Sequence, residues 1–308
     1  MQAFAAYLMR GRFQAILVAA LCAVLSLLLP PLSYLSGAAV GLVTLRKGPR
    51  EGLLVMLGTG LVVSVLAFAA LGNPSPGIAY LIVIGLPIWI LGLVLRSTAS
   101  LAFALVGATL MGALMVAGVH LFTADTWAWW RGILDVVVKP ALEQSGTLTD
   151  AQQIDLLLAE LSQILTGLLA AATVLSLVIS LLIGRWWQGM LYNPGGFRQE
   201  FHGLHISRML ALPTLVVLAV ALLSKGKIDQ IATEFLVVLL VLYMIQGLAL
   251  AHRMAARFDA HVAWLIALYG LLLVALPKVG LILAAAGFAD TWLNFRTPLN
   301  AAGDKKQD

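Results

Sequence analysis

Cysteine is almost absent from this chain. Of its 308 residues only Cys22 is a cysteine, and it lies inside the first apolar run. A single cysteine excludes an internal disulfide framework and a thiolate metal cluster. The N-terminal apolar run continues to Val43 without a small-residue cleavage site, so we expect an uncleaved first span rather than a signal peptide.

Signature motifs of catalysis and nucleotide binding are lacking as well. The chain has no GxxxxGK[ST] phosphate loop, no HExxH and no CxxC, so an ATPase that drove transport would have to be another chain. The five histidines form no close-set metal triad in the sequence: His120, His202, His205, His252 and His261. We expect a protein that is not an enzyme and that binds no metal or cofactor.

What the chain has in excess is hydrophobic sequence, at 61% against roughly 45–50% in soluble domains. Charged residues make up only 11%. Windows without charge recur at 14–45, 53–95, 97–120, 161–184, 209–224, 235–251 and 262–277. Because about 20 helical residues cross a bilayer, the windows predict an all-α, polytopic transmembrane helical bundle. In such a protein the position of positive charges matters more than the net charge of +5, and we expect no nucleic-acid partner.

Prolines and charges divide the windows into crossings. Pro30-Pro31 breaks the window 14–45, which predicts a hairpin of two short spans or a span with a re-entrant half, and Pro277-Lys278 breaks 262–289. Counting each broken stretch as two crossings gives ten spans, and counting it as one gives eight. A long helix is expected to begin near Asp150.

Charge then sets the predicted orientation. The segment 123–160 has six acidic and two basic residues, whereas 10–12, 46–50, 185–208, 253–257 and the Lys305-Lys306 tail are basic. The positive-inside rule therefore predicts that both termini are cytoplasmic and that 123–160 is the main external segment.

Small and polar residues within the spans are candidates for functional contacts. Ala15, Ala19 and Ala23 repeat at four-residue spacing, a face that lets helices approach closely. It predicts a docking face for a partner helix, with internal packing as the alternative. Glu234 and Gln246 lie within a predicted span, where ionisable groups are usually functional. We expect them to supply the polarity of a pocket that is otherwise apolar or aromatic, which favours a lipid-like ligand.

The stretch NPGGFRQEFHGLHISR, residues 193–208, interrupts the hydrophobic sequence with charge. Asn193-Pro194 predicts a turn, and Gly195-Gly196 predict the end of the preceding helix. From Phe197 onward the spacing predicts an amphipathic helix on the cytoplasmic membrane surface, with the next span beginning at Arg208.

At about 100° per residue this helix has two faces. The apolar face is Phe197, Phe201 and Leu204, which we expect at the acyl boundary. The basic residues are expected to face lipid phosphates: Arg198, His202, His205 and Arg208. A specific phosphate or partner site on the same residues is the alternative.

Two stretches carry a family resemblance. PGGFRQEF with LHISR (194–208) and GFADTWLNFR (287–296) resemble the YybS-like family of bacterial inner-membrane proteins. That family is distantly similar to the substrate-binding S components of energy-coupling-factor transporters and to the rod-shape protein MreD. The resemblance implies a bacterial inner (plasma) membrane location and an S-component-like six-span module over 13–190. The small-residue face on the first helix then looks like the one that docks on a coupling subunit.

Within a single membrane-embedded domain, 1–308, we therefore expect two sub-modules, 13–190 and 191–308. Two functional hypotheses follow. In the first, the chain is a membrane-embedded substrate-binding or transport subunit for a small or lipid-like ligand and acts with partner chains. In the second, it is a non-catalytic scaffold or assembly factor of the cell envelope without a small-molecule ligand. Membrane lipids are expected partners in both, and a membrane partner protein is expected in the first.

Overall fold

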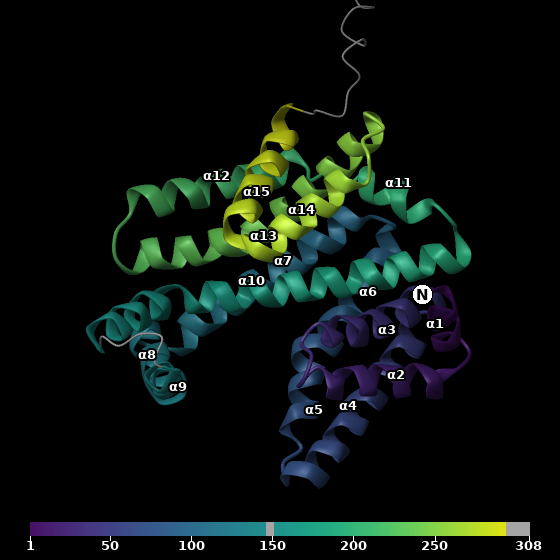
Figure 1. The fold of residues 1–308 in the computed structure, drawn as a ribbon, viewed down its shortest axis with the longest axis horizontal. Coiled ribbons are helices and arrows are strands. Elements are labelled where there is room, and N and C mark those ends of the chain that lie inside the picture. Colours follow the sequence, from purple (N-terminus) through teal and green to yellow (C-terminus); the bar gives the residue numbers. More distant parts are fainter. Residues whose placement is uncertain (146–150, 294–308) are drawn as a thin grey trace, which may run out of the picture.

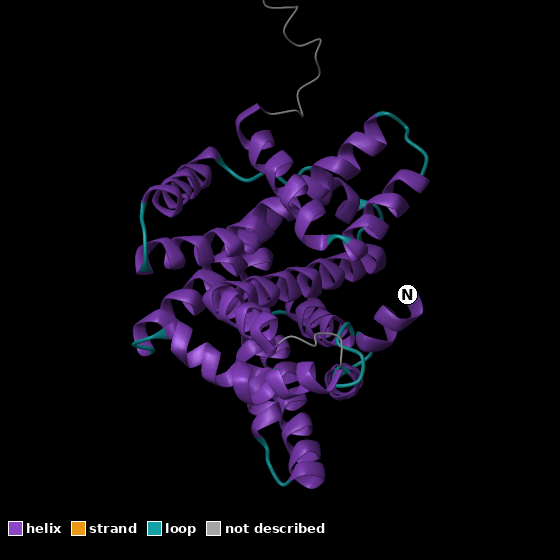
Figure 2. Cartoon of the chain, turned by 60° about the vertical axis from the view of Figure 1, so that its left-hand side comes forward, coloured by secondary structure: helices purple, strands orange, loops and turns teal. Residues whose placement is uncertain are grey.

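The fold, a computed structural model, describes residues 1–145 and 151–293, and every regular element in these ranges is helical (Figure 2). Helices predominate because a helix satisfies its own backbone hydrogen bonds where water is absent. In chain order they are α1 (Gln2–Leu8), α2 (Arg12–Leu25), α3 (Leu32–Lys47), α4 (Pro49–Leu71), α5 (Ser75–Tyr80), the π-helical segment η1 (Leu81–Gly85), α6 (Leu86–Thr98), α7 (Leu101–Phe122), α8 (Thr126–Val137), α9 (Lys139–Ser145), α10 (Ala151–Tyr192), α11 (Gly196–His202), α12 (Arg208–Leu223), α13 (Lys227–Arg257), α14 (Ala263–Val274) and α15 (Leu276–Leu293). The predicted all-α membrane bundle is confirmed.

Helix α10 is the long central element. Figure 1 shows it running through the molecule, with α1–α5 on one side, α11–α15 on the other, and α8 and α9 near one end. Its 42 residues span about 63 Å at 1.5 Å per residue, roughly twice the apolar thickness of a bilayer. It packs most extensively against α3 and α13. One continuous hydrophobic core joins both sides, from Ala5 to Ala284.

The predicted break at Pro30-Pro31 is confirmed, but the two helices that it separates are short. The turn takes up residues 26–31, which leaves 14 residues in α2 and 16 in α3. These helices measure about 21 and 24 Å, less than the bilayer core of about 30 Å. They pack against each other as a hairpin, and α3 is buried without interruption from Ser36 to Leu45.

The count of eight to ten spans is higher than the helix lengths support. Six described helices, with α5, η1 and α6 taken together, are long and apolar enough to cross, or seven if the sharply bent pair α1 and α2 counts as one. The shorter α12 and α14 are apolar. The second break falls at Ala275, before Pro277 rather than at it. Pro277 lies in the first turn of α15, where a missing backbone N–H costs nothing.

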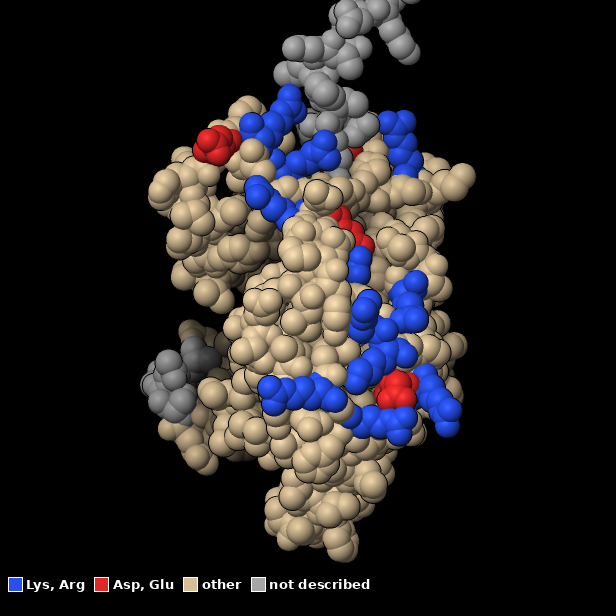
Figure 3. All heavy atoms as spheres, turned by 90° about the vertical axis from the view of Figure 1, so that its right-hand side faces the viewer, with Lys and Arg blue, Asp and Glu red and all other residues tan. Residues whose placement is uncertain are grey.

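Basic side chains gather at the end of the molecule where α3, α6 and α10 end (Figure 3). Arg96 donates hydrogen bonds to the carbonyls of Leu45 and Arg46, and the Arg46 guanidinium lies 4.0 Å from the ring centre of Tyr192. We refer to this surface as the basic end. Lys305 and Lys306, which the orientation also uses, lie outside the described residues.

Candidate functional site

Helix α11 begins after a tight turn and ends early. Gly195 has φ +85°, a backbone conformation that glycine adopts without strain, and Gly203 follows the last helical residue, His202. The predicted helix therefore stops before Leu204 and His205, because Gly203 ends the helix after about two turns. Phe201 and Leu204 are buried in the protein core, so their predicted position at the acyl boundary is wrong.

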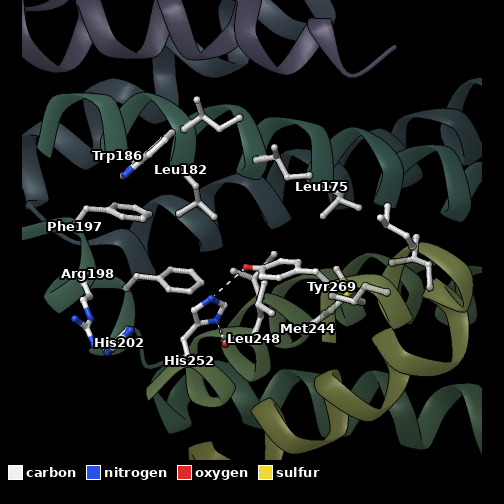
Figure 4. A pocket seen from close by; sticks show the side chains of 17 residues that line it. Leu175, Leu182, Trp186, Phe197, Arg198, His202, Met244, Leu248, His252 and Tyr269 are labelled. Carbon is white, nitrogen blue, oxygen red and sulfur yellow. Dashed lines mark hydrogen bonds between the residues drawn. The ribbon is translucent and has the colours of Figure 1, made fainter. Parts of the chain in front are cut away.

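A cavity of about 690 Å³ lies between α10, α11, α13 and α14. Its walls are almost entirely apolar, and they include Leu175, Ile179 and Leu182 from α10, Met244 and Leu248 from α13, and Leu272 and Leu273 from α14. Polar groups are concentrated near α11, where Arg198 and His202 lie beside His252 of α13 (Figure 4). The cavity is therefore amphipathic, with one cationic end.

Hydrogen bonds orient the histidine at the centre of this end. His252 Nδ1 lies 3.0 Å from the Leu248 carbonyl, which only accepts, so Nδ1 carries a proton. In the neutral imidazole, Nε2 then accepts from the Tyr269 hydroxyl at 3.3 Å. This bond joins α14 to α13 across the cavity. The edge of the His252 ring also packs on Phe201, with ring centres 5.5 Å apart.

His202 has an unusual electrostatic environment. Partial burial lowers its pKa from the ordinary value, and the positive charges of Arg198, His252 and Arg253 lower it further. Within the described part of the chain, the cavity lining includes no carboxylate. The acid of α11, Glu200, is engaged by Arg185 at 2.7 Å. The cationic end is thus suited to an anion.

The other two predicted anion-facing residues turn toward α15. Arg208 donates from Nε to the Thr291 carbonyl at 3.2 Å and from its terminal nitrogen to the Trp292 carbonyl at 3.0 Å. His205 Nδ1 lies 3.7 Å from an oxygen of Asp290. The four residues therefore do not form one surface: Arg198 and His202 face the cavity, while Arg208 binds helix-end carbonyls that attract cations.

Glu234 and Gln246 are buried but do not line this cavity, so their role as pocket polarity stays a prediction. Gln246 donates to Thr291 Oγ1 at 3.2 Å and accepts from the backbone N–H of Ile206 at 3.2 Å. Glu234 lies 2.6 Å from His120. Twelve residues of α13, about 18 Å, separate the two. Each forms its own polar cluster because a buried polar group needs a partner.

The small-residue face of α2 is also turned inward. Ala15 and Ala19 are completely buried, and the Ala19 carbonyl accepts a hydrogen bond from Ser36 of α3 at 2.7 Å. Ala23 is half-buried. The partner-docking prediction is therefore wrong for Ala15 and Ala19, because α3 already occupies the face; internal packing, the alternative, describes them.

Sequence reasoning missed His252 and Tyr269. His252 lies near the end of α13 and Tyr269 lies in the middle of the apolar α14, and only packing brings them together. The sequence did contain one indication of this site: a cluster of titratable residues in 198–205 and a second cluster of titratable residues in 252–257. Among the described residues, no three His, Cys, Asp or Glu side chains are placed to hold a metal ion.

These features define a multi-pass, all-helical membrane protein with an apolar cavity that has one cationic end. The chain belongs to the family described as "Predicted membrane protein (DUF2232)", whose model matches residues 16–291. Comparison with curated proteins and with solved structures found no match.

Proposed function

We propose that the protein is a membrane-embedded binding subunit for a lipid-like ligand and that it works in transport together with partner chains. The observation that carries the proposal is the cavity between α10, α11, α13 and α14. Its volume of about 690 Å³ lies within the roughly 300–1,000 Å³ of small-molecule sites, and such sites are mostly apolar with a few placed polar groups.

Membrane placement supports a lipid-like occupant. No residue of α14 is buried in the protein, so this apolar helix lies at the surface that faces the lipid. Three of its residues, Tyr269, Leu272 and Leu273, also line the cavity. An apolar ligand could reach the cavity from the bilayer by displacement of α14. A sugar or an ion would find almost no hydrogen-bond partners on these apolar walls, so its burial there would cost free energy.

Location and relatives are part of the proposal. We place the protein in a bacterial inner membrane with its basic end, and both termini, on the cytoplasmic side, because positive charge is retained there. The likeness to the YybS-like family, to S components of energy-coupling-factor transporters and to MreD is proposed on the motifs at 194–208 and 287–296. We also propose that the chain is not an enzyme.

Detergent purification followed by native mass spectrometry tests the proposal. The wild-type chain should retain one lipid-like molecule, and Leu182→Trp, which fills the cavity, should lose it. Leu114→Trp is the matched control, since Leu114 is 63% exposed on α7 and does not line the cavity. Circular dichroism melts establish that both variants fold.

The same preparation separates the two functional hypotheses. A bound small molecule that disappears only in Leu182→Trp supports the binding subunit. A partner protein that co-purifies with a chain free of any small molecule would contradict it and would favour the scaffold or assembly factor.

A further inference from the structure

The position of Arg198 distinguishes it from the other basic residues. It lines the cavity of about 690 Å³ and also a second cavity of about 450 Å³, which opens beside Gly195 and Gln2. Phe197 and Trp186 line both cavities as well. Arg198 thus lies where an apolar chamber meets a more polar one. Its guanidinium makes no hydrogen bond or ion pair with any residue that the structure describes.

Several donors converge at this junction. Arg198 and His202 are one helical turn apart on α11, and the His202 and His252 rings lie 6.3 Å apart across the gap between α11 and α13 (Figure 4). An arginine fork can bind two oxygens of one anion, and the His202 imidazole can donate an N–H to a further oxygen. A phosphate group offers more acceptor oxygens than a carboxylate and carries more charge.

We infer that the cavity takes an amphiphile with a phosphate head group, with its acyl chain between α10, α13 and α14 and its phosphate at Arg198 and His202. This inference rests on the proposed function and specifies its ligand class. The cationic end supplies the charge complementarity, and the lining that the structure describes includes no carboxylate that would repel a phosphate. The apolar walls exclude the head group from the deeper part of the cavity.

A binding series with single-chain probes tests the head group. The wild-type protein, purified in neutral detergent and stripped of lipid, is titrated with a monoacylglycerol phosphate, the matched fatty acid, the matched neutral monoacylglycerol and inorganic phosphate alone. Native mass spectrometry measures occupancy. We expect one phosphate probe per chain, with the neutral probe and the fatty acid each binding on the order of tenfold more weakly, because hydrogen bonds to charged groups contribute most strongly. Inorganic phosphate alone should bind weakest.

Arg198→Gln should remove most of the preference for the phosphate probe while leaving binding of the neutral probe unchanged. Arg50→Gln is the control for general attraction to a basic surface, since Arg50 lies in the first turn of α4 and does not line the cavity. An equal loss in the two variants would overturn the inference. Arg198→Lys, which keeps the charge but not the fork, should retain an intermediate preference.

The outcomes separate this inference from the proposed function. Equal binding of the phosphate, fatty-acid and neutral probes would overturn the phosphate inference and leave a lipid-binding subunit. Inorganic phosphate binding as tightly as the amphiphile would also overturn it. Failure of every amphiphile to bind would refute the proposed function itself.

Discussion

At the scale of single residues, the fold depends on polar side chains that find partners in apolar surroundings. The buried Glu234 carboxylate meets His120 Nε2 at 2.6 Å, and His120 Nδ1 lies 3.1 Å from Thr126 Oγ1. A Cβ on Gly167 would come within 2.8 Å of Glu234 Cα, so α10 approaches α13 closely beside this pair. Burying such groups is costly unless they are paired. The pair therefore stabilises the junction of α7, α8 and α13.

Removing either member of this pair should lower the free energy of unfolding by more than half of the loss caused by removing both. His120→Ala leaves Glu234 buried without its partner, which costs about 3–5 kcal/mol in buried pairs. The double variant His120→Ala/Glu234→Ala should lose less stability than the two single variants combined, because contacting residues couple by about 0.5–3 kcal/mol. Unfolding midpoints in detergent for the four proteins measure the cycle, with exposed His261→Ala as the control. Additive losses would contradict a stabilising pair.

His202 should remain neutral at pH 7 in the ligand-free protein. Its pKa is lowered by burial and by Arg198, His252 and Arg253. Below about pH 6.5 the unfolded state then binds more protons than the folded state. His202 therefore contributes stability above that pH, which is lost as pH falls through the folded pKa.

Nuclear magnetic resonance of labelled imidazoles checks this, with His202→Gln to assign the signal. A phosphate amphiphile should raise the His202 pKa, because a nearby anion favours the imidazolium, and its affinity should increase as pH falls. A folded pKa at or above 6.5 without ligand would contradict the prediction.

At the scale of elements, close helix contacts depend on glycines. A Cβ on Gly247 of α13 would overlap the Leu283 carbonyl of α15, and a Cβ on Gly287 of α15 would overlap the Tyr243 carbonyl of α13. These two helices make the most extensive helix–helix contact in the described structure. Without side chains at the crossing, the two backbones can touch. This contact also fixes α13, which carries His252 into the cavity.

Gly247→Ala and Gly287→Ala should each destabilise the protein by about 1–3 kcal/mol, because the added methyl group forces the backbones apart. Gly118→Ala and Gly270→Ala are matched helical controls, since their added Cβ would meet nothing within 4 Å. Those controls should be neutral or stabilising by up to about 1 kcal/mol, because alanine favours a helix over glycine. Thermal unfolding in detergent measures all four. Equal losses at the four positions would show that the α13–α15 contact is not the cause.

At the scale of the whole molecule, charge is distributed along the axis of α10. The basic end surrounds the end of α10, and near its start the acidic segment forms α8 and α9. Arg131 in that segment binds Asp155 at 2.8 Å and Asp135 at 3.1 Å. Few positive charges are therefore left uncompensated there, which agrees with an external location.

Reporter fusions should place residue 145 and the C-terminus on opposite sides of the membrane. A fusion at Asn73, in the uncharged turn between α4 and α5, should report the same side as residue 145, and one at Gly48 should report the side of the C-terminus. The reason is the retention of positive charge in the cytoplasm. Alkaline phosphatase and fluorescent-protein reporters measure the two sides. A shared side for residue 145 and the C-terminus would contradict the orientation.

Local sequence accounts for a large part of the architecture. Apolar windows determined the membrane helices, because a helix in lipid must bury its backbone polar groups within itself. Pro30-Pro31 determined the first hairpin, since proline cannot continue a helix interior. Asn193-Pro194 and Gly195 determined the turn before α11. Gly203 in the sequence indicated the early end of α11. The two faces predicted from Phe197 onward assumed a helix that continued beyond this glycine.

Contacts between distant segments were decided by the tertiary structure alone. His120 and Glu234 are 114 positions apart, and Arg208 reaches carbonyls more than 80 positions away. Periodicity shows which face of a helix is small or apolar, but not which helix covers it, and so the Ala15 and Ala19 face could equally have met a partner protein. The cavity has the same origin. Its walls come from five helices, α10, α11, α13, α14 and the first residue of α15, and only their packing leaves a space whose cationic end holds Arg198, His202 and His252.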